Sequence, residues 1–175
     1  MTTSNDDWRT LAGSLGREQF AAAYDHPFLL ALSGVEVANK PMQTIRLQLN
    51  GADIEAALMA ERRRLAAGER TPSVLPIRKV QPTFPSMITL GRARNNDLFV
   101  PDTLVSKFHA FFRLVDGQWT LADAGSANGT RVGDVELQPK GAAEPVRSGD
   151  RVRFGVISFQ FLDAVGLWSA LHGLK

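Results

Sequence analysis

The sequence predicts a mainly β protein, with an all-β sandwich or barrel in the second half and a mixed α/β first half. Residues 109–115 and 118–123 read as two short strands that flank a turn, and residues 118–121 alternate polar and apolar side chains as a half-buried strand does. Glycine-containing turn pairs follow at short intervals, and they are Asp116-Gly117, Asn128-Gly129 and Gly133-Asp134. Asp-Gly and Asn-Gly favour tight hairpins, so we expect both to be hairpin turns.

The first half has a different pattern. Residues near 7–24 place apolar side chains on one helical face, and "HPFLLALSG" reads as a short buried strand that begins after Pro27. Residues 42–49 alternate as a second strand does, and residues 53–67 are expected to form a helix that Asp53 caps. This half is either an arm packed on the sandwich, with "HPFLLAL" at a sheet edge, or a self-association element.

Prolines mark the expected boundary between the halves. Proline occurs at positions 72, 76, 82 and 85, and strands there should be edge-like or interrupted because proline cannot donate to a sheet ladder. We therefore expect an N-terminal extension over residues 1–70 and a β domain over residues 71–165. Residues 166–175 should form a short C-terminal helix, with Leu167, Leu171 and Leu174 available for packing.

Composition excludes several classes of function. Of the 175 residues, 44% are hydrophobic and 22% are charged, which is typical of a soluble globular chain. No cysteine is present, so disulfides and thiolate chemistry are excluded. The formal net charge of +2 does not indicate a nucleic-acid partner. The polar, acidic N-terminus does not resemble a signal peptide, and we expect a cytoplasmic protein without membrane insertion.

Hydrogen-bond donors gather at the turns of the β half. Arg92 offers a planar guanidinium that suits phosphate oxygens, and Ser106 offers a hydroxyl. Lys107 adds an ammonium, and Asn128 adds an amide that can both donate to and accept from a peptide backbone. Loops of a sandwich collect at its two ends, so these side chains can converge on one site.

The order and spacing of these motifs resemble a known family. The segments "LGRARNNDLFVPDTLVSKFHAFFRL", "WTLADAGSANGTRVGD", "VRSGDRVRFG" and "FQFL" are similar, in this order, to the forkhead-associated (FHA) domain. The resemblance covers about residues 74–163. It implies an eleven-stranded β-sandwich of the SMAD/FHA-like type that recognises phosphothreonine peptides through loops at one end.

The resemblance also implies roles for individual residues. Arg92 would grip the phosphate, Ser106 and Lys107 would contact it, and Asn128 would bind the main chain of the peptide. Leu104 would read the third residue after the phosphothreonine, which suggests an aliphatic preference there. Gly91 and Gly129 would shape turns, and His109 and Thr130 would support the site.

One position departs from the family, and several residues have simpler explanations. Ala127 stands where the family often has serine or threonine, although a backbone N–H would remain there. Arg92 could instead pair with Asp97 or Asp102, and Ser106 could be a turn residue. Arg94, Lys107 and the run Arg62-Arg63-Arg64 can be explained as solvated charge.

The function implied is binding and not catalysis. No nucleophile–base pair, phosphate-binding glycine loop or metal-ligand cluster occurs in the sequence, so we expect no enzyme activity, cofactor or metal. The resemblance implies a bacterial phosphothreonine-peptide-binding adaptor that works with a Ser/Thr protein kinase or its substrate. The alternative is a scaffold of the same fold that binds proteins without phosphate, for example in a secretion-system or regulatory assembly.

Overall fold

The computed structural model describes residues 5–32 and 74–173. Its helices are α1 (Asn5–Ser14), α2 (Arg17–Ala23) and α4 (Ala164–Gly173). Its strands are β1 (Phe28–Ala31), β2 (Val74–Pro76), β3 (Ile88–Gly91), β4 (Leu98–Phe99), β5 (Ala110–Val115), β6 (Gln118–Asp123), β7 (Thr130–Val132), β8 (Val135–Glu136), β9 (Glu144–Pro145), β10 (Arg151–Phe154) and β11 (Ile157–Leu162). The expected strand at 42–49 and the expected helix at 53–67 lie outside these residues.

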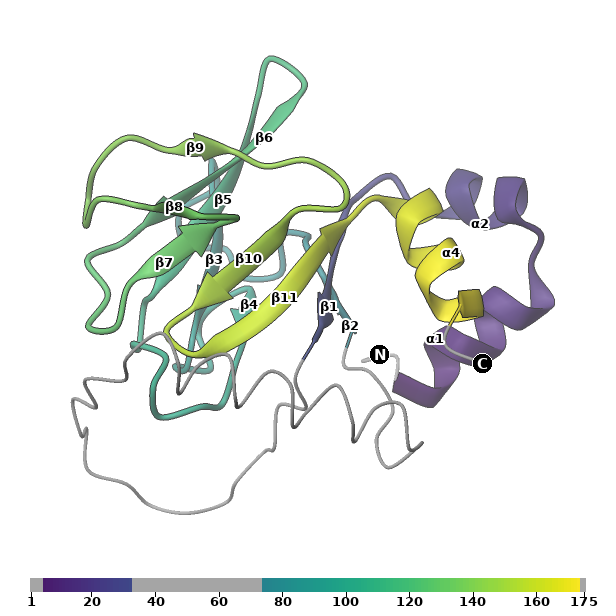
Figure 1. The fold of residues 1–175 in the computed structure, drawn as a ribbon, viewed down its shortest axis with the longest axis horizontal. Helices are drawn as coiled ribbons and strands as arrows, with labels where there is room; N and C mark the ends of the chain where they lie inside the picture. The colour runs from purple at the N-terminus through teal and green to yellow at the C-terminus, as the bar shows by residue number, and fades with distance from the viewer. Residues whose placement is uncertain (1–4, 33–73, 174–175) are drawn as a thin grey trace.

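The strands form two sheets that face each other, as Figure 1 shows. One sheet has the order β2-β1-β11-β10-β7-β8, and the other has the order β4-β3-β5-β6-β9. Neighbouring strands are antiparallel except for β3 and β4, which pair in parallel. The mainly β sandwich predicted from the sequence is confirmed.

The core lies between the sheets and contains the inward-facing side chains of both. Phe112 of β5 packs against Phe154 of β10 and Phe161 of β11, with ring centroids 6.4 Å and 6.1 Å apart. All three rings are almost fully buried. Alternation along each strand explains this arrangement, because every second side chain points toward the opposite sheet.

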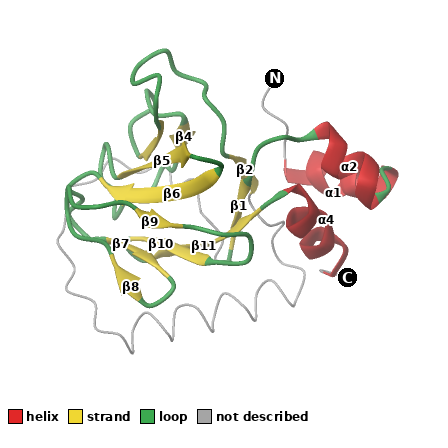
Figure 2. Cartoon of the chain, turned by 90° about the horizontal axis from the view of Figure 1, so that it is seen from above, coloured by secondary structure: helices red, strands yellow, loops and turns green. Residues whose placement is uncertain are grey.

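A second apolar cluster joins the helices to one end of the sandwich. Trp8 of α1, Phe20 of α2 and Leu167 of α4 are buried together with Phe28 of β1. Trp168 donates its indole N–H to the carbonyl of Leu15 at 3.0 Å. The helices therefore form one packed group at the end of the sandwich (Figures 1 and 2).

The N-terminal part differs in detail from the sequence prediction. The helical region expected near 7–24, with interruptions at Gly13 and Gly16, is two helices that are separated where the chain is extended at Gly16, whereas Gly13 lies within α1. The strand expected after Pro27 is present as β1, but it lies between β2 and β11 and is not an edge strand. The division at residue 71 stays a prediction, although β1 pairs directly with the C-terminal strand β11.

Two turn predictions have opposite outcomes. Asp116 and Gly117 have φ of 49° and 78° and join β5 to β6 as a two-residue hairpin, as predicted. Asn128-Gly129 is not a hairpin turn, because β6 and β7 belong to different sheets. The loop that contains this pair crosses from one sheet to the other, which places Asn128 at an end of the sandwich.

The prolines that lie within strands are in edge strands. Pro76 lies in β2 and Pro145 lies in β9, and each strand is at the edge of its sheet. The C-terminal helix begins at Ala164, two residues before the expected start, and Leu167 and Leu171 are buried. Within the described ranges, no helix combines the length and the apolar character needed to cross a membrane.

Candidate phosphate-binding loops

The end of β3 brings Arg92 next to Ser106. The backbone N–H of Arg92 donates to the carbonyl of Ser106 at 3.0 Å, and that of Ala93 donates to the carbonyl of Lys107 at 3.2 Å. The backbone is close enough here that a Cβ on Gly91 would lie 2.3 Å from the Lys107 oxygen. A glycine at position 91 is therefore required for the two segments to meet.

Asn96 strengthens this junction from inside. The side chain is almost fully buried, and its Nδ2 donates to the carbonyls of Lys107 at 2.7 Å and Ala93 at 2.8 Å. Nothing in the sequence distinguishes Asn96 from other polar loop residues. An asparagine in a polar loop is common, and only its partners in the structure distinguish it from a solvated one.

Ser106 connects to the third loop through its hydroxyl. The backbone N–H of Ala127 donates to Ser106 Oγ at 3.0 Å. The backbone N–H that remains at position 127 is therefore bonded within the protein. Because a hydroxyl can accept and donate at the same time, the Ser106 O–H is still able to donate to an anion.

His109 links two loops through hydrogen bonds at both of its ring nitrogens. The backbone N–H of Ser106 donates to His109 Nδ1 at 3.0 Å, so this nitrogen carries no proton. The Nε2–H then donates to the carbonyl of Gly129 at 3.1 Å. The ring is fully buried, and burial lowers its pKa below the ordinary 6.5 although the Gly129 carbonyl and the charge of Asp123 act in the opposite direction. The neutral imidazole thus links two loops.

Asp123 shapes the loop that carries Asn128. Its Oδ1 accepts from the backbone N–H of Gly125 and Ser126 at 2.7 and 2.8 Å, and its Oδ2 accepts from the hydroxyls of Ser126 and Thr130 at 2.6 and 2.5 Å. Burial raises the pKa of this carboxyl, but the hydrogen bonds outweigh burial and lower it. Ser126 therefore points into the loop and does not replace the hydroxyl that Ala127 lacks.

Asn128 is held against the neighbouring loop. Its Nδ2 donates to the carbonyl of Leu104 at 2.8 Å. The same carbonyl lies 2.9 Å from the position that a Cβ on Gly155 would take, so the β10–β11 turn also packs here. Asn128 keeps its Oδ1 and one amide hydrogen for a peptide backbone.

The cations of these loops form no ion pairs with the acids nearby in sequence. Asp97 is bonded to Lys79 and Asp102 Oδ1 accepts from the N–H of Leu104, so the proposed pairing of Arg92 with either acid does not form. Arg94 lies over the Phe99 ring, with Cζ 5.0 Å from its centroid. Lys107 is exposed. The loops therefore present positive charge without a neutralising carboxylate among the described residues.

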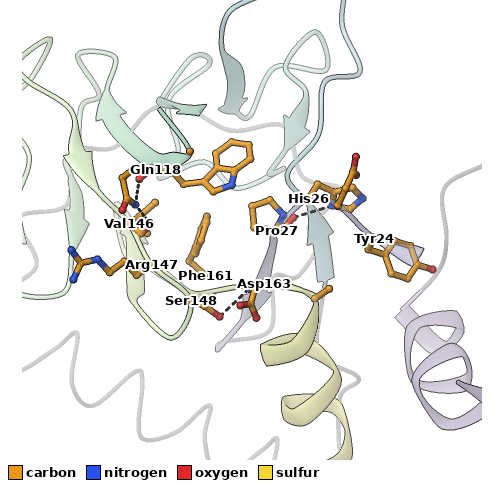
Figure 3. Close-up of a pocket in the computed structure, with 13 residues that line it drawn as sticks. Tyr24, His26, Pro27, Gln118, Val146, Arg147, Ser148, Phe161 and Asp163 are labelled. Carbon is orange, nitrogen blue, oxygen red and sulfur yellow. Dashed lines mark hydrogen bonds between the residues drawn. The ribbon is translucent and has the colours of Figure 1, made fainter. Parts of the chain in front are cut away.

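A separate hollow of about 310 Å³ lies at the other end of the β5–β6 hairpin. It is bordered by Gln118, Pro27 and Phe161 (Figure 3). Two of its polar side chains have structural partners, since Gln118 Nε2 donates to the Val146 carbonyl at 3.0 Å and Ser148 Oγ accepts from the N–H of Asp163 at 3.0 Å. Within the described part of the chain, no group of three His, Cys, Asp or Glu could hold a metal ion.

Comparison with known proteins identifies the β region. Residues 88–155 match the family described as FHA domain. The chain contains an FHA domain. The loops described above all lie within the matched residues or directly border them. The resemblance deduced from the motifs is confirmed.

Two relatives of this FHA domain come from Corynebacterium and Mycolicibacterium. The oxoglutarate dehydrogenase inhibitor of Corynebacterium diphtheriae is 39% identical over 75 residues, which cover 43% of this chain and 50% of that protein. The glycogen accumulation regulator GarA of Mycolicibacterium smegmatis is 39% identical over 72 residues, which cover 41% and 43%. The chain thus spans about half the length of these relatives.

Among solved structures, one from a study of phosphothreonine-dependent FHA domain interactions is 26% identical, with a TM-score of 0.43. It covers 51% of this chain and 83% of the other.

Proposed function

We propose that the FHA domain is a non-enzymatic phosphothreonine-peptide-binding module of a bacterial, Ser/Thr kinase-linked regulatory protein in the cytoplasm. Arg92, Ser106 and Lys107 bind the phosphate, and Asn128 binds the peptide main chain. The observation that carries the proposal is the junction of three loops, in which Arg92 N–H bonds to Ser106 and Ser106 Oγ bonds to Ala127.

The charge of the site suits a doubly anionic ligand. A phosphothreonine carries nearly two negative charges and three acceptor oxygens at neutral pH. The carboxylates of Asp97 and Asp123 point inward and accept several protein hydrogen bonds each. The guanidinium of Arg92 and the ammonium of Lys107 therefore act on the ligand without competition from these acids.

The names of the relatives support a regulatory role. One relative is called an inhibitor of a dehydrogenase and the other a regulator of glycogen accumulation. Neither name describes a catalyst. The partner of this chain is proposed to be a protein or peptide with a phosphothreonine, either the kinase or one of its substrates.

The test is calorimetric titration with a degenerate phosphothreonine peptide library. Arg92→Ala is expected to weaken binding by about 2–4 kcal/mol, because it removes charge-assisted hydrogen bonds of about 1.5–3 kcal/mol each. Arg94→Ala is the matched control, since Arg94 lies in the same loop but over Phe99, and it should bind like the wild type. Equal affinities of wild type and Arg92→Ala would remove Arg92 from the site.

Leu104 is proposed to select the third residue after the phosphothreonine. Its carbonyl is fixed by Asn128, which places this residue beside the groups proposed to bind the peptide. We expect a preference for aliphatic side chains at that position. A peptide array with acidic preference or none at that position would reject this role.

A phosphate-independent scaffold of the same fold is the second candidate. Ala127 favours it, because the site lacks the hydroxyl that the family often has at this position and the Ala127 N–H is already bonded. Pull-downs with phosphorylated and dephosphorylated partner separate the candidates. Equal capture of both forms would support the scaffold.

A further inference from the structure

Two exposed phenylalanines stack beside the proposed phosphate site. The side chains of Phe84 and Phe108 are 54% and 38% exposed, and their rings are nearly parallel with centroids 6.0 Å apart. Phe111 continues the row, with its ring 6.2 Å from that of Phe108. Phe84, Phe108 and Phe111 are here called the aromatic shelf. Single exposed apolar side chains are ordinary, but a stacked group at a loop junction calls for a reason.

The backbone that presents Phe84 is unusual. Phe84 has a φ of 54°, a region that bulky residues other than glycine rarely occupy. Glycine or asparagine would adopt this conformation with less backbone strain. An exposed phenylalanine here adds little to the stability of the fold. Strain of this kind is commonly found where a side chain is positioned for binding.

Specific hydrogen bonds hold the loop around Phe84. Lys79 Nζ donates to the carbonyls of Thr83 at 2.6 Å and Met87 at 2.9 Å, on either side of Phe84. The same ammonium pairs with Asp97 at 2.8 Å. The shelf is therefore fixed in place before any ligand arrives, which lowers the entropy cost of binding on it.

The aromatic shelf is continuous with the phosphate loops. Phe108 lies between Lys107 and His109, in the loop that contains Ser106. Asp97, which anchors the Phe84 loop, lies five positions after Arg92 in the loop that begins with that arginine. A peptide held at Arg92 and Ser106 would thus pass directly beside the shelf.

Leu104 and Phe108 contact different loops on the two sides of Ser106. The backbone of Leu104 faces the β6–β7 loop, because its carbonyl accepts from Asn128. The ring of Phe108 faces Phe84, in the β2–β3 loop. Ser106 lies between Leu104 and Phe108 in the chain. Leu104 contacts the β6–β7 loop and Phe108 contacts the β2–β3 loop, so the two sides of Ser106 border different loops.

We propose that the aromatic shelf binds an apolar side chain of the phosphothreonine ligand, at a residue that precedes the phosphothreonine. This inference rests on the proposed function and on the assignment of Leu104 to the residues that follow. The shelf makes this FHA domain selective for peptides with both a phosphate and an apolar residue on its N-terminal side.

The test compares two sets of phosphothreonine peptides by calorimetry. In one set a single leucine is moved through the four positions before and the four positions after the phosphothreonine, and the reference peptide has alanine at all of them. The wild type is expected to prefer a leucine before the phosphothreonine by about tenfold. Contact over roughly 50–60 Å² of apolar surface corresponds to such a change.

Phe84→Asn is the decisive variant. Asparagine tolerates a positive φ, so the loop should keep its shape while the ring is lost. The variant should bind the alanine peptide as the wild type does and lose the tenfold preference for leucine. Leu114→Asn is the matched control, because Leu114 is 57% exposed but lies near the far end of β5, and it should keep the preference.

The outcomes separate this inference from the proposed function. If the wild type binds phosphothreonine peptides but Phe84→Asn shows the same leucine preference, the shelf has no role and the proposed function stands. A preference only after the phosphothreonine, or a dimer that Phe84→Asn dissociates without changing peptide affinity, also overturns the inference. If the wild type binds no phosphothreonine peptide, the proposed function and this inference are both overturned.

Discussion

Protonation of Asp97 should weaken the fold in a defined pH range. Its carboxylate accepts from the backbone N–H of Val80, Gln81 and Thr89, at 2.7–2.8 Å, and pairs with Lys79. None of the side chain is exposed. This one residue therefore connects the Phe84 loop, strand β3 and the loop that begins with Arg92.

The magnitude follows from the pKa of Asp97. Burial raises the pKa, but the hydrogen bonds from Lys79 and the backbone outweigh burial and lower it from 3.8 to about 2. Because the folded state holds the proton less tightly than the unfolded state, the stabilisation is complete above pH 3.8 and is lost as the pH falls through 2. It amounts to about 2 kcal/mol at neutral pH, of which about half remains at pH 3.

Urea unfolding of the wild type and Asp97→Asn between pH 7 and pH 3 measures this contribution. The variant should be less stable by at least about 2 kcal/mol at pH 7, and the gap should narrow by about 1 kcal/mol at pH 3. Asp134→Asn, at the exposed β7–β8 turn, is the control and should change stability by less than about 0.5 kcal/mol throughout. If the difference in unfolding free energy between the wild type and Asp97→Asn stays constant with pH, the reasoning is refuted.

Three further predictions concern the site and the helices. Gly91→Ala should destabilise the domain by more than about 2 kcal/mol in urea unfolding and abolish phosphopeptide binding, because its Cβ would lie 2.3 Å from the Lys107 oxygen. Gly13→Ala should instead stabilise the protein by about 0.5–1 kcal/mol, since the site in α1 is open; a loss of stability would contradict this. The imidazole of His109 should remain neutral with its proton on Nε2 below pH 6.5 in ¹⁵N NMR spectra, and its contribution to stability, present above pH 6.5, should be lost as the pH falls through the lowered pKa.

Local conformation could be predicted from the sequence, but strand partners could not. Asp116-Gly117 forms the expected hairpin because both residues need positive φ, which this pair adopts easily. Asn128-Gly129 carries the same local signal, yet β6 and β7 lie in different sheets. The turn pair specifies a change of direction, and the hydrophobic faces of distant strands decide where the chain continues.

The place of β1 within its sheet also could not be predicted from the local sequence. Its apolar run predicts a buried strand, and residues 28–31 form one. Its partners, β2 and β11, are distant in sequence, and Leu29 pairs with Phe161. Periodicity identifies a strand, but the choice between the edge and the interior of a sheet depends on contacts between residues far apart in the chain.

In the site, the residues proposed to face the ligand could be predicted from the sequence, but the internal residues that hold them could not. Arg92, Ser106 and Asn128 could be singled out because their side chains suit a phosphopeptide and their spacing resembles a family. The residues that hold them, Asn96 and Asp123, were missed because their role depends on partners that only the fold reveals. Asn96 donates to two backbone carbonyls, and Asp123 accepts from backbone N–H groups and hydroxyls of its own loop. A partial signal existed for Asp123, since an aspartate that ends a strand before serine and glycine often accepts hydrogen bonds from the next turn.

The charge of the loops depends on which side chains face inward. A net charge of +2 over the whole chain indicates no strong attraction for anions. The carboxylates of Asp97 and Asp123, however, accept hydrogen bonds inside the loops, while Lys107 is exposed. The acids thus act as acceptors that shape the scaffold, and the cations remain to act on a ligand. A localised positive site can arise in this way in a nearly neutral chain, and its attraction should extend about 8–10 Å at physiological ionic strength, because salt screens longer distances.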